Sequence, residues 1–121
     1  MARGVVIVGA VMAPGRAEGF PTALRDVIAV GAIEDAPAGG NVLSAPGRDI
    51  LTLMPGGTYD FVSGSSMATA HVSGAVALLR SLDGQLAPAA LRKLLQQGGA
   101  GGIDICRAMQ GLTRGSTACG K

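Results

Sequence analysis

Two continuous runs of aliphatic residues set the hydrophobic pattern of the first half of the chain. Residues 5–8 and 27–31 contain no alternating polar positions, and such runs are typical of strands buried on both faces of a parallel sheet. Residues 49–53 predict a third, shorter strand. Residues 59–62 predict a further strand, joined to the third by a tight turn at the Pro-Gly-Gly of residues 55–57.

The second half of the chain changes to a helical pattern. Residues 66–82 carry small or apolar side chains on every side, which is typical of a buried helix. Gly74 costs such a helix about 1 kcal/mol relative to alanine, and we expect a neighbouring segment to pack closely against it. A second helix is predicted from Pro88 to the glycines at 98–99. A short third helix is predicted over residues 104–109, with an aspartate as its cap.

Composition narrows the class of protein. The 121 residues fit a single domain over residues 1–121. Hydrophobic residues make up 48% and charged residues 15% of the chain, whereas about 25% charged residues is typical. This composition suits the core part of a larger α/β domain, and it predicts exposed apolar surface where the chain stands alone.

Charge and hydropathy exclude two classes of partner. The net charge is +2 without a basic run, so nothing favours nucleic-acid binding. No apolar run reaches 18 residues, so no transmembrane helix and no membrane partner are expected. The apolar stretch that ends in Ala10–Ala13 resembles a signal-peptide cleavage region, but the element is shorter than the usual 15–30 residues. A buried strand is therefore favoured over a signal peptide.

The two cysteines, Cys106 and Cys119, lie 13 positions apart. Their spacing matches no zinc pattern, and two cysteines with one histidine are too few ligands for a convenient metal site. We expect no metal and no cofactor. Two alternatives remain for the pair: a disulfide that closes the C-terminal tail in an oxidising compartment, or two unpaired thiols.

The most specific motif is the stretch Gly-Ser-Ser-Met-Ala-Thr-Ala-His-Val-Ser-Gly at residues 64–74. It resembles the nucleophile segment of the subtilisin-like serine proteases, whose usual form is Gly-Thr-Ser-Met-Ala-x-Pro-His-Val-x-Gly. The resemblance implies that Ser66 is the nucleophile of peptide-bond hydrolysis by acyl transfer. Ala70 replaces the usual proline.

Further segments resemble the same family in the same order, so that the resemblance covers nearly the whole chain. They are residues 5–10, the Phe-Pro at 20–21, residues 27–32, 44–50 and 102–104. The resemblance implies the C-terminal portion of a catalytic domain, with a partial three-layer α/β/α sandwich and a mainly parallel sheet. It also implies substrate-binding roles for Gly9, Ala10 and Gly64, and a secreted or periplasmic location.

Two departures from the family pattern concern the chemistry. The catalytic Asp and His segments that the family carries upstream are absent, and Ala13 occupies the position of the oxyanion asparagine. The single histidine, His71, follows Ser66 by five residues, which means about 140° of rotation and 7.5 Å of rise on a helix. A base must approach to about 2.6–3.2 Å. His71 would therefore act as the base only from a second chain, and in the family the matching histidine is structural.

Three hypotheses for function remain open. In the first, the chain is part of a peptidase and needs an N-terminal half, or self-association, to complete the site. In the second, the chain is a small serine esterase that acts on short-chain esters. In the third, it is a catalytically dead relic or an assembly module, an idea that the loss of the oxyanion asparagine supports.

Overall fold

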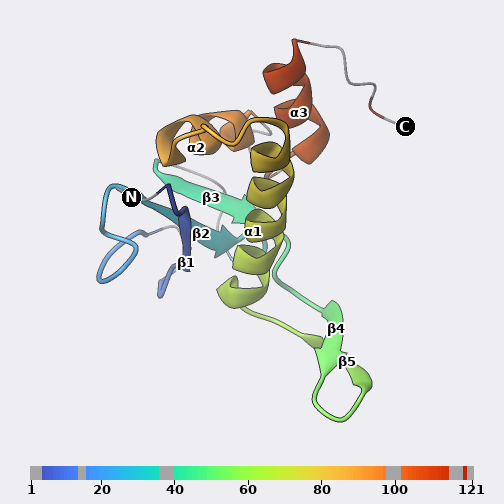
Figure 1. The fold of residues 1–121 in the computed structure, drawn as a ribbon. Helices are drawn as coiled ribbons and strands as arrows, with labels where there is room; N and C mark the ends of the chain where they lie inside the picture. The colour runs from blue at the N-terminus through green and yellow to red at the C-terminus, as the bar shows by residue number, and fades with distance from the viewer. Residues whose placement is uncertain (1–3, 14–15, 36–39, 98–101, 115–118, 120–121) are drawn as a thin grey trace.

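The structure is a computed structural model, which describes residues 4–13, 16–35, 40–97, 102–114 and 119 (Figure 1). The elements in chain order are the strands β1 (Ile7–Ala10), β2 (Val27–Ala32), β3 (Val42–Ala45), β4 (Ile50–Met54) and β5 (Thr58–Val62), followed by the helices α1 (Ser65–Leu82), α2 (Pro88–Gln96) and α3 (Ile105–Thr113). Residues 36–39, in the predicted turn, and the glycines 98–99, the predicted end of α2, lie outside the described residues. In the described part of the chain, no helix has the length and hydropathy to cross a membrane.

A three-stranded parallel sheet forms the centre of the fold, with β2 between β1 and β3. Every residue of β2 is buried, as its continuous apolar run predicts. The prediction that the first run is buried on both faces is wrong: β1 begins at Ile7, whose side chain is 38% exposed. The reason is its place in the sheet, because β1 lies at an edge and pairs only with β2 among the described strands.

Strand β3 was not predicted from the sequence. Its four residues, Val42–Ala45, are all buried, and they follow the glycines and proline that predict a turn. The run is too short to show a period, so the sequence pattern carries little signal for it. In the structure, β3 gains its place from parallel pairing with β2.

The core lies between the sheet and one face of α1. Ile28 and Val30 of β2 pack there with Val72 and Leu79 of α1, and α2 adds Leu91 to the same cluster. On the opposite face of the sheet a second cluster joins the buried residues Val11, Ala29 and Val42 to Ala17. The described chain is therefore an α/β fold with a parallel sheet, as predicted.

The other face of α1 is exposed, so the prediction of a helix buried all round is wrong. Leu78 and Leu82 are each 49% exposed, and Ala70 and Gly74 are exposed as well. The sheet covers only the side of α1 that carries Val72 and its buried neighbours. The opposite side of α1 carries small side chains and borders a groove. No second layer of described residues covers it.

Gly74 offers a direct test of this exposed face. An added Cβ would meet no atom within 4 Å, so the expectation of close packing at Gly74 is also wrong. Gly74→Ala is expected to raise the free energy of unfolding by up to about 1 kcal/mol through helix propensity, as measured by urea unfolding. Gly111→Ala in α3 is the matched control, because its Cβ would lie 3.2 Å from both Gln97 and Leu94. A loss of stability in Gly74→Ala would show that a segment does cover this face.

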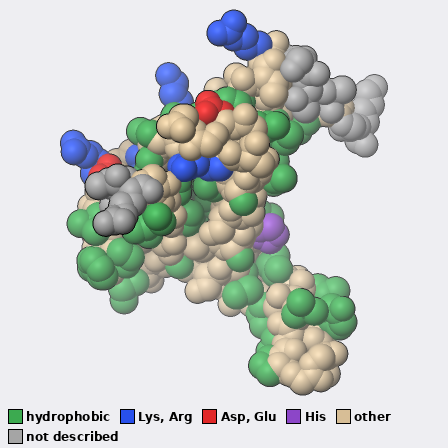
Figure 2. All heavy atoms as spheres, viewed as in Figure 1, with side chains coloured by type: hydrophobic (Ala, Val, Ile, Leu, Met, Phe, Trp, Pro, Cys, Tyr) green, Lys and Arg blue, Asp and Glu red, His purple; other side chains and the backbone are tan. Residues whose placement is uncertain are grey.

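Strands β4 and β5 form an antiparallel hairpin that projects from the rest of the fold (Figure 1). Both strands lie within one residue of the predicted bounds, and the turn between them is where it was predicted. The pairs Leu51–Phe61 and Leu53–Tyr59 lie on one face of the hairpin, and these four side chains are 59–71% exposed. Hydrophobic side chains cover much of the projecting hairpin in Figure 2. The apolar surface predicted from composition is therefore present.

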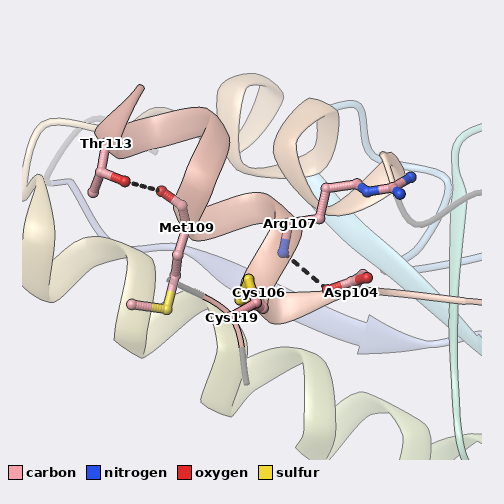
Figure 3. Close-up of a disulfide and its surroundings, with 6 residues drawn as sticks. All are labelled: Asp104, Cys106, Arg107, Met109, Thr113 and Cys119. Atoms are coloured by element: carbon pink, nitrogen blue, oxygen red, sulfur yellow. Dashed lines mark hydrogen bonds between the residues drawn. A yellow bond between two sulfur atoms is a disulfide. The ribbon is translucent and has the colours of Figure 1, made fainter. Parts of the chain in front are cut away.

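Helix α3 begins as predicted and ends later than predicted. The Asp104 carboxylate accepts a hydrogen bond from the Arg107 N–H at 2.9 Å, the geometry of an N-cap (Figure 3). The helix continues to Thr113 rather than ending at residue 109. Cys106 in its first turn is disulfide-bonded to Cys119, and their Cα atoms lie 5.7 Å apart. Of the two alternatives for the cysteines, the structure has the disulfide.

Candidate active site

Ser66 is the second residue of α1, and it is exposed. Among the described residues, neither its hydroxyl nor its backbone N–H has a hydrogen-bond partner, whereas the Met67 N–H donates to the Gly64 carbonyl at 3.0 Å. The first N–H groups of a helix lack intrahelical acceptors, and the helix dipole makes this end positive. A free hydroxyl and a free N–H on one residue are the groups that acyl transfer needs from its nucleophile.

The neighbouring serine ties the start of α1 to the parallel sheet. The Ser65 hydroxyl donates to the Val11 carbonyl at 2.9 Å, and the Val11 N–H donates to Val30 at 2.9 Å. The chain that leaves β1 therefore lies against the first turn of α1. The structure thereby brings the Gly9–Ala10 end of β1 to the side of the helix start.

Ala13 follows this same segment, two residues after the Val11 contact. It forms an isolated bridge with Arg16, whose N–H donates to the Ala13 carbonyl at 3.2 Å. A methyl side chain cannot donate a hydrogen bond. At this position the chain therefore offers no side-chain hydrogen-bond donor.

Gly64, the residue before the helix, has a backbone conformation that favours glycine. Its φ is 141°, and it is the N-cap of α1 without a side-chain cap. Its N–H donates to the Gly47 carbonyl at 2.7 Å. An added Cβ on Gly47 would lie 2.8 Å from the Gly64 carbonyl oxygen. Two backbone segments that are far apart in sequence are therefore hydrogen-bonded directly before Ser66, with no room for a side chain at Gly47.

His71 lies one turn further along α1, and its ring contacts a different part of the chain. Its Nδ1 is 3.1 Å from the Pro46 carbonyl oxygen. Because a carbonyl only accepts, Nδ1 carries the proton in this contact. The structure thus ties His71 to the loop before β4 and shows no interaction between His71 and Ser66.

Glu34 is a residue of this region that sequence reasoning missed. Its carboxylate accepts from the Gly47 N–H, at 3.0 Å to one oxygen and 3.3 Å to the other. A hydrogen bond from its own backbone N–H, with a further one from Gly47, lowers the pKa of Glu34 from its ordinary value of 4.5. The sequence gives only a weak sign that Glu34 belongs to this region, namely a carboxylate two residues after a buried strand.

An apolar groove of about 400 Å³ lies along the exposed face of α1. It is lined by Ile50 and Thr52 of β4, by Ile105 of α3, and by side chains of α1 that include Met67, the residue after Ser66. Within the part of the chain that the structure describes, no three His, Cys, Asp or Glu residues are placed to hold a metal ion.

Known proteins are similar to this chain in sequence and in fold. The intracellular serine protease of Paenibacillus polymyxa is 47% identical over 72 residues, which cover 53% of this chain and 22% of that protein. The subtilisin of Bacillus pumilus is 44% identical over 71 residues, which cover 52% of this chain and 26% of that protein. Each match therefore takes in only about a quarter of the relative.

Solved structures give the same result for the fold. The prenylagaramide maturation protease PagA superposes with a TM-score of 0.73 at 26% identity, over 90% of this chain and 51% of that chain. The patellamide maturation protease PatA superposes with a TM-score of 0.73 at 29% identity, over 95% of this chain and 54% of that chain. The model of the Subtilase family matches residues 10–111, and the chain therefore belongs to the subtilisin-like serine protease family.

Proposed function

We propose that residues 1–121 form a single domain, the C-terminal portion of a subtilisin-like catalytic domain, and that this portion supplies Ser66 as the nucleophile of peptide-bond hydrolysis. One observation carries the proposal. Within the family signature, Ser66 has a hydroxyl and a backbone N–H that make no hydrogen bond to any described residue, and it lies at the start of α1. Family membership gives this arrangement its chemical meaning.

The proposed reaction has two halves. The Ser66 hydroxyl attacks the scissile carbonyl and gives its proton to a base, while the Ser66 N–H donates to the oxygen that becomes negative. Collapse of this intermediate releases the amine, which takes the proton from the base, and leaves an acyl ester on Ser66. Water, deprotonated by the same base, then attacks the ester; the peptide acid is released, and the Ser66 oxygen takes the proton back from the base. Gly64 and the Gly9–Ala10 segment would lie along the bound peptide.

No described residue is hydrogen-bonded to the Ser66 hydroxyl as a base, so the base must come from another segment. The chain has one histidine, His71, and its ring is held by the Pro46 carbonyl. We therefore propose that the histidine and aspartate of the family triad are supplied by the upstream half of a catalytic domain. Solved relatives are about twice as long as the part matched here, with 51–54% of their chains covered.

One edge of β1 has no partner among the described strands, and this edge supports such an arrangement. Because the Val11 N–H bonds Val30 and parallel ladders alternate, the N–H and C=O groups of Val8 and Ala10 point away from β2. At the opposite edge of the sheet, part of the β3 backbone already has a partner, since the Ile103 N–H donates to the Ser44 carbonyl at 2.8 Å. An added strand would satisfy the open edge. We propose that the upstream half pairs there, and self-association is the competing outcome.

Ala13 favours a second candidate, a slow esterase. Without a side-chain donor at this position, the oxyanion loses a bond whose removal costs about 10²–10³ in rate. Activated esters have better leaving groups than amides, so they would be cleaved where peptides are not. A chain that cleaves neither would be the inactive relic.

The test is covalent labelling by a fluorophosphonate. The full chain is labelled alone and after fusion to the part of the P. polymyxa protease that precedes its match to this chain. We expect labelling of the fusion, at Ser66, with slow or no labelling of the chain alone. Labelling of neither, with both proteins folded by circular dichroism, would reject the proposed function.

A further inference from the structure

The loop between β3 and β4 holds the start of α1 at separate points. The Gly47 carbonyl accepts from the Gly64 N–H at 2.7 Å, and the Pro46 carbonyl accepts from His71 at 3.1 Å. The Asp49 N–H donates to the Ser63 hydroxyl at 2.9 Å. These contacts fix residues on both sides of Ser66, although Ser66 itself makes no hydrogen bond to the described residues of the loop. The position of Ser66 therefore depends on the position of this loop.

Glu34 holds that loop from behind. It lies two residues after β2, and both of its carboxylate oxygens lie within hydrogen-bond distance of the Gly47 N–H. Gly47 is thus bonded through its N–H to Glu34 and through its carbonyl to Gly64. A bond to a carboxylate is about twice as strong as one between neutral groups. From its exposed position, Glu34 therefore anchors the N–H of Gly47 while the carbonyl of Gly47 accepts from Gly64.

We infer that Glu34 is a positioning residue for Ser66, acting through the chain of contacts from Glu34 to Gly47 to Gly64. Gly64 sets the entry of the first turn of α1, because its carbonyl accepts from the Met67 N–H. Glu34 touches no reacting atom and takes no proton in the reaction. The catalytic meaning of this inference rests on the proposed function, whereas the contacts themselves do not.

The inference predicts a dependence on pH. The lowered pKa of Glu34 means that its stabilising effect is present above pH 4.5 and is lost as the pH falls through the lower pKa of the folded chain. Among the described residues, the charged groups near Glu34 are Arg48, which favours its ionised form, and Asp35, which pairs with Arg48 at 3.4 Å. Asp35 and Arg48 are both exposed.

Amide hydrogen exchange on the full chain tests the contact directly. In Glu34→Gln the Gly47 N–H loses its charged acceptor and is expected to exchange about tenfold faster at neutral pH, the difference between a charged and a neutral hydrogen bond. The Gly64 N–H, which donates to the Gly47 carbonyl, is expected to exchange faster as well. The Val72 and Leu79 amides, deep in α1, should keep their rates. Asp35→Asn, the matched control, removes the neighbouring carboxylate and should leave Gly64 unchanged. An unchanged Gly64 rate, or equal acceleration of the Gly64, Val72 and Leu79 amides, would overturn the inference.

A second measurement covers the case in which Glu34→Gln does not fold. In the wild-type chain the Gly64 amide resonance should move with the protonation of Glu34 below pH 4.5. A resonance that does not move over this range contradicts the inference.

Labelling separates this inference from the proposed function. In the fusion protein, Glu34→Gln should slow fluorophosphonate labelling about tenfold, because the bond between the Glu34 side chain and the Gly47 N–H is weakened. If no variant labels but the Gly64 exchange responds as expected, the proposed function fails and the positioning contact stands. If the wild type labels, and Glu34→Gln labels equally fast with Gly64 exchange unmoved, the positioning role is wrong and the proposed function stands.

Discussion

Replacement of Ser66 by alanine should remove essentially all hydrolysis by the fusion protein. Within the described part of the chain, no other hydroxyl at the start of α1 is without a hydrogen-bond partner, since the neighbouring Ser65 hydroxyl donates to the Val11 carbonyl. In a subtilisin, loss of the nucleophile lowers kcat by about 10⁶. The measurement is turnover of a short peptide and of a short-chain p-nitrophenyl ester, with fluorophosphonate labelling of the same samples.

The control for this variant is Ser73→Ala. Ser73 lies on the same helix and is exposed, so its loss should change neither turnover nor labelling. Equal turnover by wild type and Ser66→Ala would show that the chemistry lies elsewhere or is absent. Turnover of the ester without turnover of the peptide would favour the esterase candidate and point to Ala13 as the cause.

The sequence predicted the elements whose signals are local. Strand β2, the β4–β5 hairpin and helix α1 each carry their own pattern, either an apolar run, a turn or small residues over many positions. Where the prediction was wrong, the determinant was not local. Nothing in the run at residues 5–8 says that β1 has one neighbour rather than two, and this decides whether Ile7 is exposed.

The residues of the candidate site also divide into those with a local sequence signal and those without one. Ser66 was identified from an 11-residue motif, residues 64–74, so the nucleophile could be proposed without a fold. The contact between Gly47 and Gly64 involves only backbone atoms of residues 17 positions apart, and no side-chain pattern encodes it. Glu34 was missed for the same reason, because its partner is a backbone N–H.

The contact of His71 also shows that the spacing of residues along a helix does not reveal what a side chain contacts. Helical geometry predicted that His71 points away from Ser66, and the structure adds what it points toward, the Pro46 carbonyl. A residue of the signature motif thus anchors the loop that carries Gly47. The motif therefore contains the proposed nucleophile together with one of the contacts that hold the loop beside it.

Gly47→Ala is expected to have the largest effect on stability of the changes considered, because the site has no room for a methyl group. The added Cβ would lie 2.6 Å from the Ala32 Cβ and 2.8 Å from the Gly64 carbonyl oxygen. Both neighbours belong to rigid parts, the end of β2 and the N-cap of α1, so the loop itself must move. Overpacking of this kind costs about 1–3 kcal/mol, measured as a lower free energy of unfolding in urea.

The same variant should also slow the labelling of Ser66 at temperatures where the chain stays folded, because the displaced loop no longer holds the Gly64 N–H at 2.7 Å. Gly74→Ala is the matched comparison, since it adds the same methyl group in open space and should be neutral or stabilising. If Gly47→Ala unfolds at the wild-type urea concentration, the two backbones do not meet as closely as the structure places them. In that case the positioning role of Glu34, which acts through Gly47, would lose its basis as well.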